Sequence, residues 1–188
     1  MARPLSDEKR AAIMAAATRV IASRGLTAST AAIAKEAGVS NGALFTYFST
    51  KADLLNQLYV ELKSEMGAAA TKGLPTPSDP RNQLFHLWRN WLMWAASSPE
   101  KRRAMAQLNV SEDITPESRK AGQQTMAGVA SLIERTRKAG SMRDASPAFV
   151  AALLGSIADT TIDFMIAEPA KADEHCATSF EVLRRTLV

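Results

Sequence analysis

Hydrophobic residues recur at intervals of three and four along most of the chain, and no run of residues alternates with a period of two. The first repeating set is Ile13, Ala16, Ala17, Val20 and Ile21. Spacing of this kind places apolar side chains on one face of an α-helix, whereas a half-buried strand needs strict alternation. Ser6 or Asp7 can cap this first helix, and Gly25 can end it. The pattern therefore predicts an all-α protein.

Further helices are expected after the first, and together they number about nine. The same spacing and capping signals predict helices at about 30–38, 41–48, 50–71, 80–97, 99–109, 116–139, 147–167 and 170–187. Four of the later segments have a proline at or near their start, where its missing N–H costs nothing: Pro99, Pro116, Pro147 and Pro169. The clearest interruption is GLPTPSDP, residues 73–80, whose three prolines and one glycine forbid a continuous helix.

The stretch IAKEAGVSNGALFTYFSTK, residues 33–51, contains two short helical segments with a break at Gly38. Two short helices that cross steeply after a tight turn form a helix-turn-helix. Ala34 is small enough for a close crossing, and Gly38 accepts a positive φ without steric cost. The inner face is apolar and consists of Ile33, Ala37, Val39 and Leu44. Because helices this short are not stable alone, the first helix is expected to complete their core.

The outer face of this pair suits contact with DNA, although a helical hairpin without a DNA role would share the same inner face. Small uncharged residues at the start of a recognition helix can enter the major groove, here Asn41, Gly42, Ala43 and Thr46. Ser40, Tyr47 and Lys51 flank them with hydroxyls and a cation that suit phosphate oxygens. Thr30 adds a hydroxyl beside the free N–H groups of a helix start.

The charge distribution agrees with a polyanionic partner for the N-terminal quarter. The chain has 188 residues, of which 46% are hydrophobic and 22% charged, which is ordinary for a soluble globular protein. Residues 1–55 hold seven Lys and Arg against four Asp and Glu, whereas the rest hold sixteen against fifteen. Most of the net charge of +4 therefore lies in the part that contains the helix-turn-helix.

The run ASTAAIAKEAGVSNGALFTYFSTKADLL, residues 28–55, closely resembles the N-terminal domain of TetR-family transcriptional regulators. That family combines hydroxyl residues, Ile-Ala, Ala-Gly-Val-Ser, an aromatic-rich recognition helix, and then Lys and Leu-Leu. The matching residues are Ser29, Thr30, Ile33, Ala34, Ala37, Gly38, Val39, Ser40, Gly42, Leu44, Tyr47, Phe48, Lys51, Leu54 and Leu55. Two positions depart from the pattern, because Phe45 replaces a usual tyrosine and Asn41 a frequent basic residue.

The resemblance implies a DNA-binding domain at residues 1–52, with the helix-turn-helix at about 28–47, and a C-terminal helical bundle at 53–188. The bundle would bind a small-molecule effector and form a homodimer. The protein would be a repressor on a palindromic operator, which effector binding releases. The expected DNA contacts are Ser29, Thr30, Ser40, Asn41, Gly42, Ala43, Phe45, Thr46, Tyr47 and Lys51.

The C-terminal part contains the aromatic stretch FHLWRNWLMW, residues 85–94, which has two interpretations. Aromatic residues three apart drift around a helix, so they can form a core ridge or the wall of a ligand cavity. Methionines elsewhere favour the cavity slightly, because they adapt to irregular space. The candidate ligand contacts are Trp88, Trp91, Met105, Met126, Asp163 and Phe164.

The last two helices are expected to form the dimer interface, because one recognition helix covers too few base pairs for a specific site. Gly155 would permit close approach of a second copy. The apolar residues assigned to this interface are Leu153, Ile157, Phe164, Phe180, Leu183 and Leu187. A symmetric pair of such helices would make a four-helix bundle.

Catalytic and metal chemistry have little support in the sequence. Asp159 and Asp163 lie one helical turn apart without a nucleophile, and His86 and His175 lack metal-ligand spacing. The single cysteine, Cys176, has no partner for a disulfide. We therefore expect no enzyme activity, catalytic residue, metal or cofactor. We also expect a cytoplasmic protein, without a signal peptide and without an apolar stretch long enough to span a membrane.

A helical enzyme or small-molecule carrier that uses the aromatic region without DNA remains a second interpretation. A DNA-binding architectural protein without an effector is a third. Retention on heparin and a gel shift on upstream DNA separate a DNA-binding protein from an enzyme or carrier.

Overall fold

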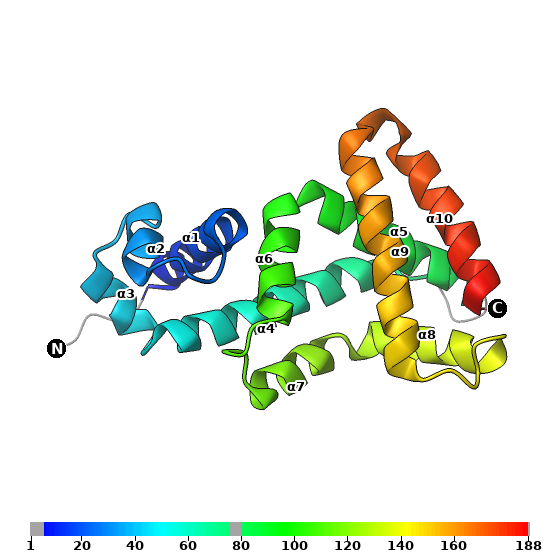
Figure 1. Ribbon diagram of the computed structural model, residues 1–188, viewed down its shortest axis with the longest axis horizontal. Helices are drawn as coiled ribbons and strands as arrows, with labels where there is room; N and C mark the ends of the chain where they lie inside the picture. Colours follow the sequence, from blue (N-terminus) through cyan, green and yellow to red (C-terminus); the bar gives the residue numbers. More distant parts are fainter. Residues whose placement is uncertain (1–5, 76–79, 188) are drawn as a thin grey trace. The chain divides into compact units, whose positions relative to one another are not determined.

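A computed structural model describes residues 6–75 and 80–187 of the chain, and within these ranges all regular elements are helices (Figure 1). The all-α prediction is confirmed. Residues 76–79 of the predicted interruption lie outside the described residues. The helices are α1 Asp7–Arg24, α2 Thr30–Glu36, α3 Asn41–Tyr47, α4 Lys51–Thr71, α5 Pro80–Ser97, α6 Pro99–Asn109, α7 Pro116–Thr125, α8 Ala127–Ala139, α9 Pro147–Ala167, the 3₁₀ helix η1 Pro169–Lys171, and α10 Ala172–Leu187.

The segment predicted as one helix over 116–139 is two helices, α7 and α8, which are separated at Met126. At this break the backbone of Thr125 lies close to α4. A Cβ atom added to Gly67 of α4 would lie 2.7 Å from the carbonyl oxygen of Thr125, so only a glycine leaves room for the chain there. Periodicity within 116–139 does not show this tertiary contact, because its partner lies on another helix.

The described residues form two compact units that do not follow the order of the chain. The first contains α1, α2, α3, the start of α4 up to Ser64, α6, and α7 up to Gln124. Helix α1 packs against α2 and α6. The core of this unit includes Ile13, Met14, Ile21, Ile33, Leu44, Phe48, Leu54, Leu58, Met105 and Leu108. Helix α6 thus supports the N-terminal helices although it follows the predicted interruption at 73–80.

The second unit contains the end of α4 from Glu65, together with α5, α8, α9, η1 and α10. Helices α9 and α10 run side by side, and both contact α5 (Figure 1). Their shared core includes Leu84, Trp88, Leu92, Val150, Leu154, Ile162, Phe180, Leu183 and Leu187. A smaller cluster joins Ala70 of α4, Leu87 of α5, and Val129 and Leu132 of α8. The predicted boundary at residue 52, between a DNA-binding domain and an effector-binding domain, concerns function and stays a prediction.

Helix α9 is more apolar than one buried face requires. An 18-residue window of this helix has a mean hydropathy of 1.6, so α9 is long and apolar enough to cross a membrane by length and composition. The sequence-based expectation of no such stretch was therefore wrong. A single helix of this kind is weak evidence for a membrane span, since the core helix of a soluble protein passes the same test. Only 33% of the window is buried in the fold, which leaves apolar residues on an exposed face.

The connection between α8 and α9 is fixed by Arg137, whose side chain is only 7% exposed. Its Nη1 donates to the backbone carbonyl oxygens of Met142, Arg143 and Ala145. Its Nε and Nη2 donate to the two carboxylate oxygens of Glu134, at 2.8 and 2.7 Å. The hydrogen bond from Arg137 is the main reason that the pKa of Glu134 is lowered to about 2. This guanidinium therefore holds the turn before α9 in place.

Replacing Glu134 with glutamine should lower the thermal unfolding midpoint at pH 7, because Arg137 then loses its carboxylate partner. The pKa of Glu134 lies below its ordinary value of 4.5 in the folded state, so its stabilising effect is complete above pH 4.5. That effect disappears as the pH falls towards about 2. The difference between wild type and Glu134→Gln should therefore shrink over this range when unfolding is followed by circular dichroism. The exposed Glu112→Gln serves as the control, and an equal pH response in both variants would contradict the prediction.

Candidate nucleic-acid interface

Local capping and one glycine shape the α2–turn–α3 segment. Ser29 and Ser40 stand before the two helices, and their side-chain oxygens accept hydrogen bonds from the N–H groups of Ala32 and Ala43, at 3.2 and 3.1 Å. Gly38 has a φ of 69°, a backbone conformation that is strained for a residue with a side chain. The turn closes where the N–H of Val39 donates to the carbonyl oxygen of Ala34, at 3.0 Å. These local rules make two seven-residue helices joined by a tight turn, as the sequence predicts.

The inner face of this helix pair is packed as expected. Ile33, Ala34 and Leu44 are 0–1% exposed and share a core with α1 residues such as Ile13. Ala37 and Val39 are partly buried against the same core. Helix α1 thus forms the third wall of the helix-turn-helix. On the opposite face, Asn41, Gly42, Phe45 and Thr46 are exposed.

The ten expected DNA contacts lie around the start of α2, along α3 and at the start of α4. Those that are exposed are Ser29, Ser40, Asn41, Gly42, Phe45 and Thr46. Those that are half-buried are Thr30, Ala43, Tyr47 and Lys51. The aromatic ring of Phe45 is an exposed large apolar group, at 42%. The outer surface of α3 is therefore small, mainly uncharged and open to a groove-shaped partner, apart from this one ring.

Two of these residues also hold the domain together, which sequence reasoning missed. The hydroxyl of Tyr47 accepts a hydrogen bond from the backbone N–H of Ser6, at 3.1 Å, and its own proton can still be donated. The ammonium of Lys51 donates to the carbonyl oxygen of Leu26, at 2.5 Å. A lysine has three N–H donors, so two of them remain for another acceptor. No local signal reveals these contacts, because the partners are 41 and 25 residues away.

The six candidate ligand contacts are distributed over both units, and the rings of Trp88 and Trp91 are in contact. Trp88 is 1% exposed and its Nε1–H donates to Ser179 Oγ at 3.0 Å, so it is a core residue of the second unit. Trp91 is half-buried, with its ring edge-to-face to Trp88. Met105 belongs to the core of the first unit, whereas Met126 packs partly against the Leu87 cluster. The remaining two, Asp163 and Phe164, are exposed on α9.

Two short helices with a shared buried face, a glycine turn and an exposed outer surface form a helix-turn-helix, a motif that occurs in DNA-binding proteins. Residues 13–58 match the family model described as bacterial regulatory proteins, tetR family. The chain thus carries the N-terminal domain of the TetR family and has the fold of TetR-family transcription regulators, which confirms the resemblance seen in the sequence.

Solved structures with this fold span nearly the whole chain. A TetR-family regulator from Shewanella sp. PV-4 is 24% identical, with a TM-score of 0.83 and coverage of 97% of this chain and 98% of its own. One from Marinobacter aquaeolei VT8 is 22% identical, with a TM-score of 0.81 and coverage of 93% of each chain. FadR from Bacillus subtilis, solved in complex with stearoyl-CoA, is 19% identical, with a TM-score of 0.68 and coverage of 95% and 97%.

Proposed function

We propose that the protein is a ligand-responsive repressor that binds a palindromic operator as a homodimer. The observation that carries this proposal is the exposed, mainly uncharged outer face of α3 on a firmly packed helix-turn-helix. Asn41 and Thr46 would read base edges in the major groove, with Phe45 against a thymine methyl group. Ser29, Thr30, Ser40, Tyr47 and Lys51 would contact phosphates and fix the register of the helix.

Replacing Asn41 with alanine should relax the sequence preference at one base pair. A bidentate amide contact to adenine contributes about 1–3 kcal/mol of discrimination, and the Asn41 side chain is exposed on α3. The measurement is a gel shift with matched and single-substituted operators, selected from upstream DNA, at several salt concentrations. Asn109→Ala, which changes an exposed asparagine at the end of α6, is the control. A uniform loss of affinity for every sequence would show that Asn41 does not read a base.

The proposed dimer uses an apolar surface on α9 and α10. Large apolar residues exposed there are Phe149 at 59%, Phe164 at 51%, Ile166 at 42% and Val182 at 50%. A Cβ atom added to Gly155 would have no neighbour within 4 Å, so the surface around it is open to a second helix. This surface differs in part from the one that the sequence suggested. Phe180, Leu183 and Leu187 are at most 4% exposed, because they fill the core of their own unit.

Effector binding in the second unit would release DNA through α4. This helix contributes Lys51–Ser64 to the first unit and Glu65–Thr71 to the second, so it belongs to both. FadR from Bacillus subtilis, which shares the fold, was solved with stearoyl-CoA, and this supports a ligand for the present chain. A ligand acts only through unequal affinity for the DNA-competent and incompetent states. Such coupling typically amounts to about 1–3 kcal/mol, or a several-fold to hundredfold change in operator affinity.

Mapping of bound sites across the genome, followed by a reporter placed behind each site, tests the regulatory role. Repression predicts higher reporter output when the gene for this protein is deleted. Lower output on deletion would make the protein an activator. Absence of any enriched site, together with no retention on heparin, would remove DNA binding and leave the enzyme or carrier interpretation.

A further inference from the structure

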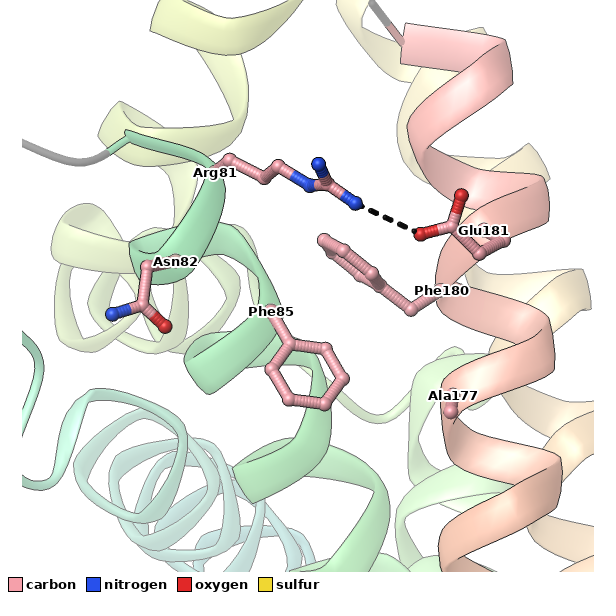
Figure 2. Close-up of a pocket in the computed structure, with 6 residues that line it drawn as sticks. All are labelled: Arg81, Asn82, Phe85, Ala177, Phe180 and Glu181. Carbon is pink, nitrogen blue, oxygen red and sulfur yellow. Dashed lines mark hydrogen bonds and ion pairs between the residues drawn. The ribbon is translucent and has the colours of Figure 1, made fainter.

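The second unit contains an open groove between the start of α5 and the middle of α10 (Figure 2). Its volume is about 410 Å³, and its lining residues are Arg81, Asn82, Phe85, Ala177, Phe180 and Glu181. The rings of Phe85 and Phe180 meet edge-to-face, with 4.9 Å between their centroids. They give the groove an apolar floor, while the polar groups stand at one end. Mainly apolar lining with a few polar groups is typical of sites for small organic ligands.

Arg184, which does not line the groove, pairs with Glu181 and gives the polar end one positive charge in excess of Arg81 and Glu181. Arg81 Nη2 lies 3.3 Å from Glu181 Oε1, and this ion pair crosses the groove above the two rings (Figure 2). The other carboxylate oxygen of Glu181 accepts from Arg184 Nε and Nη2, at 3.1 and 3.0 Å. Two guanidinium groups therefore face one carboxylate. The hydrogen bond from Arg184 is also the main reason that the pKa of Glu181 is lowered.

Arg81 can leave Glu181 at little cost. The Arg81 side chain is 68% exposed and that of Glu181 43%, and exposed ion pairs contribute little to stability. Arg184 keeps Glu181 paired when Arg81 turns away, so no carboxylate is left alone. A planar guanidinium binds a carboxylate through two parallel hydrogen bonds, which is a better geometry than the present single contact.

We propose that this groove binds an amphiphilic monoanion, with its carboxylate on Arg81 and its hydrocarbon part against Phe85, Ala177 and the small exposed part of Phe180. The apolar floor selects a hydrocarbon chain or ring, and the excess positive charge selects an anion over a neutral or cationic head group. The site stands independently of the regulatory role. An effector role for the bound molecule rests on the proposed function.

Titration calorimetry with octanoate, octan-1-ol and octylamine tests the head group and the chain separately. We expect saturable binding of octanoate, weaker binding of octan-1-ol, and none of octylamine. Arg81→Gln should weaken octanoate binding by about tenfold or more, because a charge-assisted pair is lost, and should leave octan-1-ol unaffected. Arg143→Gln is the matched control, since Arg143 is 71% exposed in the same unit but does not line the groove.

A second variant tests the apolar part of the site. Ala177 is an exposed residue of the groove wall, so Ala177→Leu should fill space there and weaken octanoate and octan-1-ol alike. Circular dichroism checks that both variants are folded. No saturable octanoate binding, or binding that neither variant changes, would overturn the proposal. Octanoate binding that responds to both variants but leaves operator affinity unchanged would support the site and count against an effector role.

Discussion

Replacing Leu44 with alanine should abolish operator binding by unfolding the helix-turn-helix. Leu44 is fully buried on the inner face of α3, in the core that it shares with Ile33 and α1. A leucine-to-alanine change at a buried position costs about 2–5 kcal/mol, because contacts are lost and a cavity remains. Helices α2 and α3 have only seven residues each, so they depend on this core for their stability. Without it, the recognition surface is no longer held in one shape.

Phe45→Ala is the matched control for this variant. Phe45 is the next residue of α3 but is 42% exposed, so its truncation should change stability by no more than about 0.5 kcal/mol. Urea unfolding followed by circular dichroism measures the stability of both variants, and a gel shift measures operator affinity. Phe45→Ala should lose affinity without losing stability. If Leu44→Ala keeps both its stability and its operator affinity, the core assignment of α3 fails.

The helix-turn-helix could be predicted because its requirements lie close together in the sequence. Ser29 and Ser40 each cap a helix that begins at the next residue, and Gly38 has the positive φ that the turn needs. Each of these effects acts over a few residues, so the sequence itself contains the signal. The apolar inner face follows from helical spacing in the same way. The fold class and the position of the helix-turn-helix could therefore both be predicted from local spacing.

Features that depend on distant partners could not be predicted in this way. Helical spacing left Trp88 as either a core or a cavity residue. Its burial in the core of the second unit, with a hydrogen bond to Ser179 that lies 91 residues further along the chain, makes it a core residue. The break between α7 and α8 depends on Gly67 of α4, whose closeness to Thr125 no local pattern reveals. The α5–α10 groove needs Phe85 and Phe180 to meet across the fold. Pairings of this range are set by packing.

The apolar surface of α9 and α10 is another feature that the sequence predicts only in part. Periodicity identified both helices as apolar but could not separate the face that packs within the unit from the face left over. Leu183 and Leu187 of α10 turned out to be core, whereas Val182 of the same helix is 50% exposed. Helix α9 also exposes apolar residues, among them Phe149, Phe164 and Ile166, which is one reason that it resembles a membrane span in composition. A second copy of the chain would cover the remainder.

Replacing Phe164 with glutamate should convert the proposed dimer into a monomer and so remove specific operator binding. Phe164 is 51% exposed on α9, and a buried unpaired carboxylate in an apolar interface is strongly unfavourable. A dimer places two recognition helices on one operator, and linking two sites raises affinity by about 10²–10⁴-fold over one site alone. The monomer should lose this factor while both units stay folded. Light scattering measures the mass and a gel shift the affinity.

Val110→Glu is the control, because Val110 is an apolar residue at 79% exposure that lies outside α9 and α10. A Phe164→Glu protein that remains dimeric at micromolar concentration and binds the operator as tightly as the Val110→Glu protein would place the interface elsewhere.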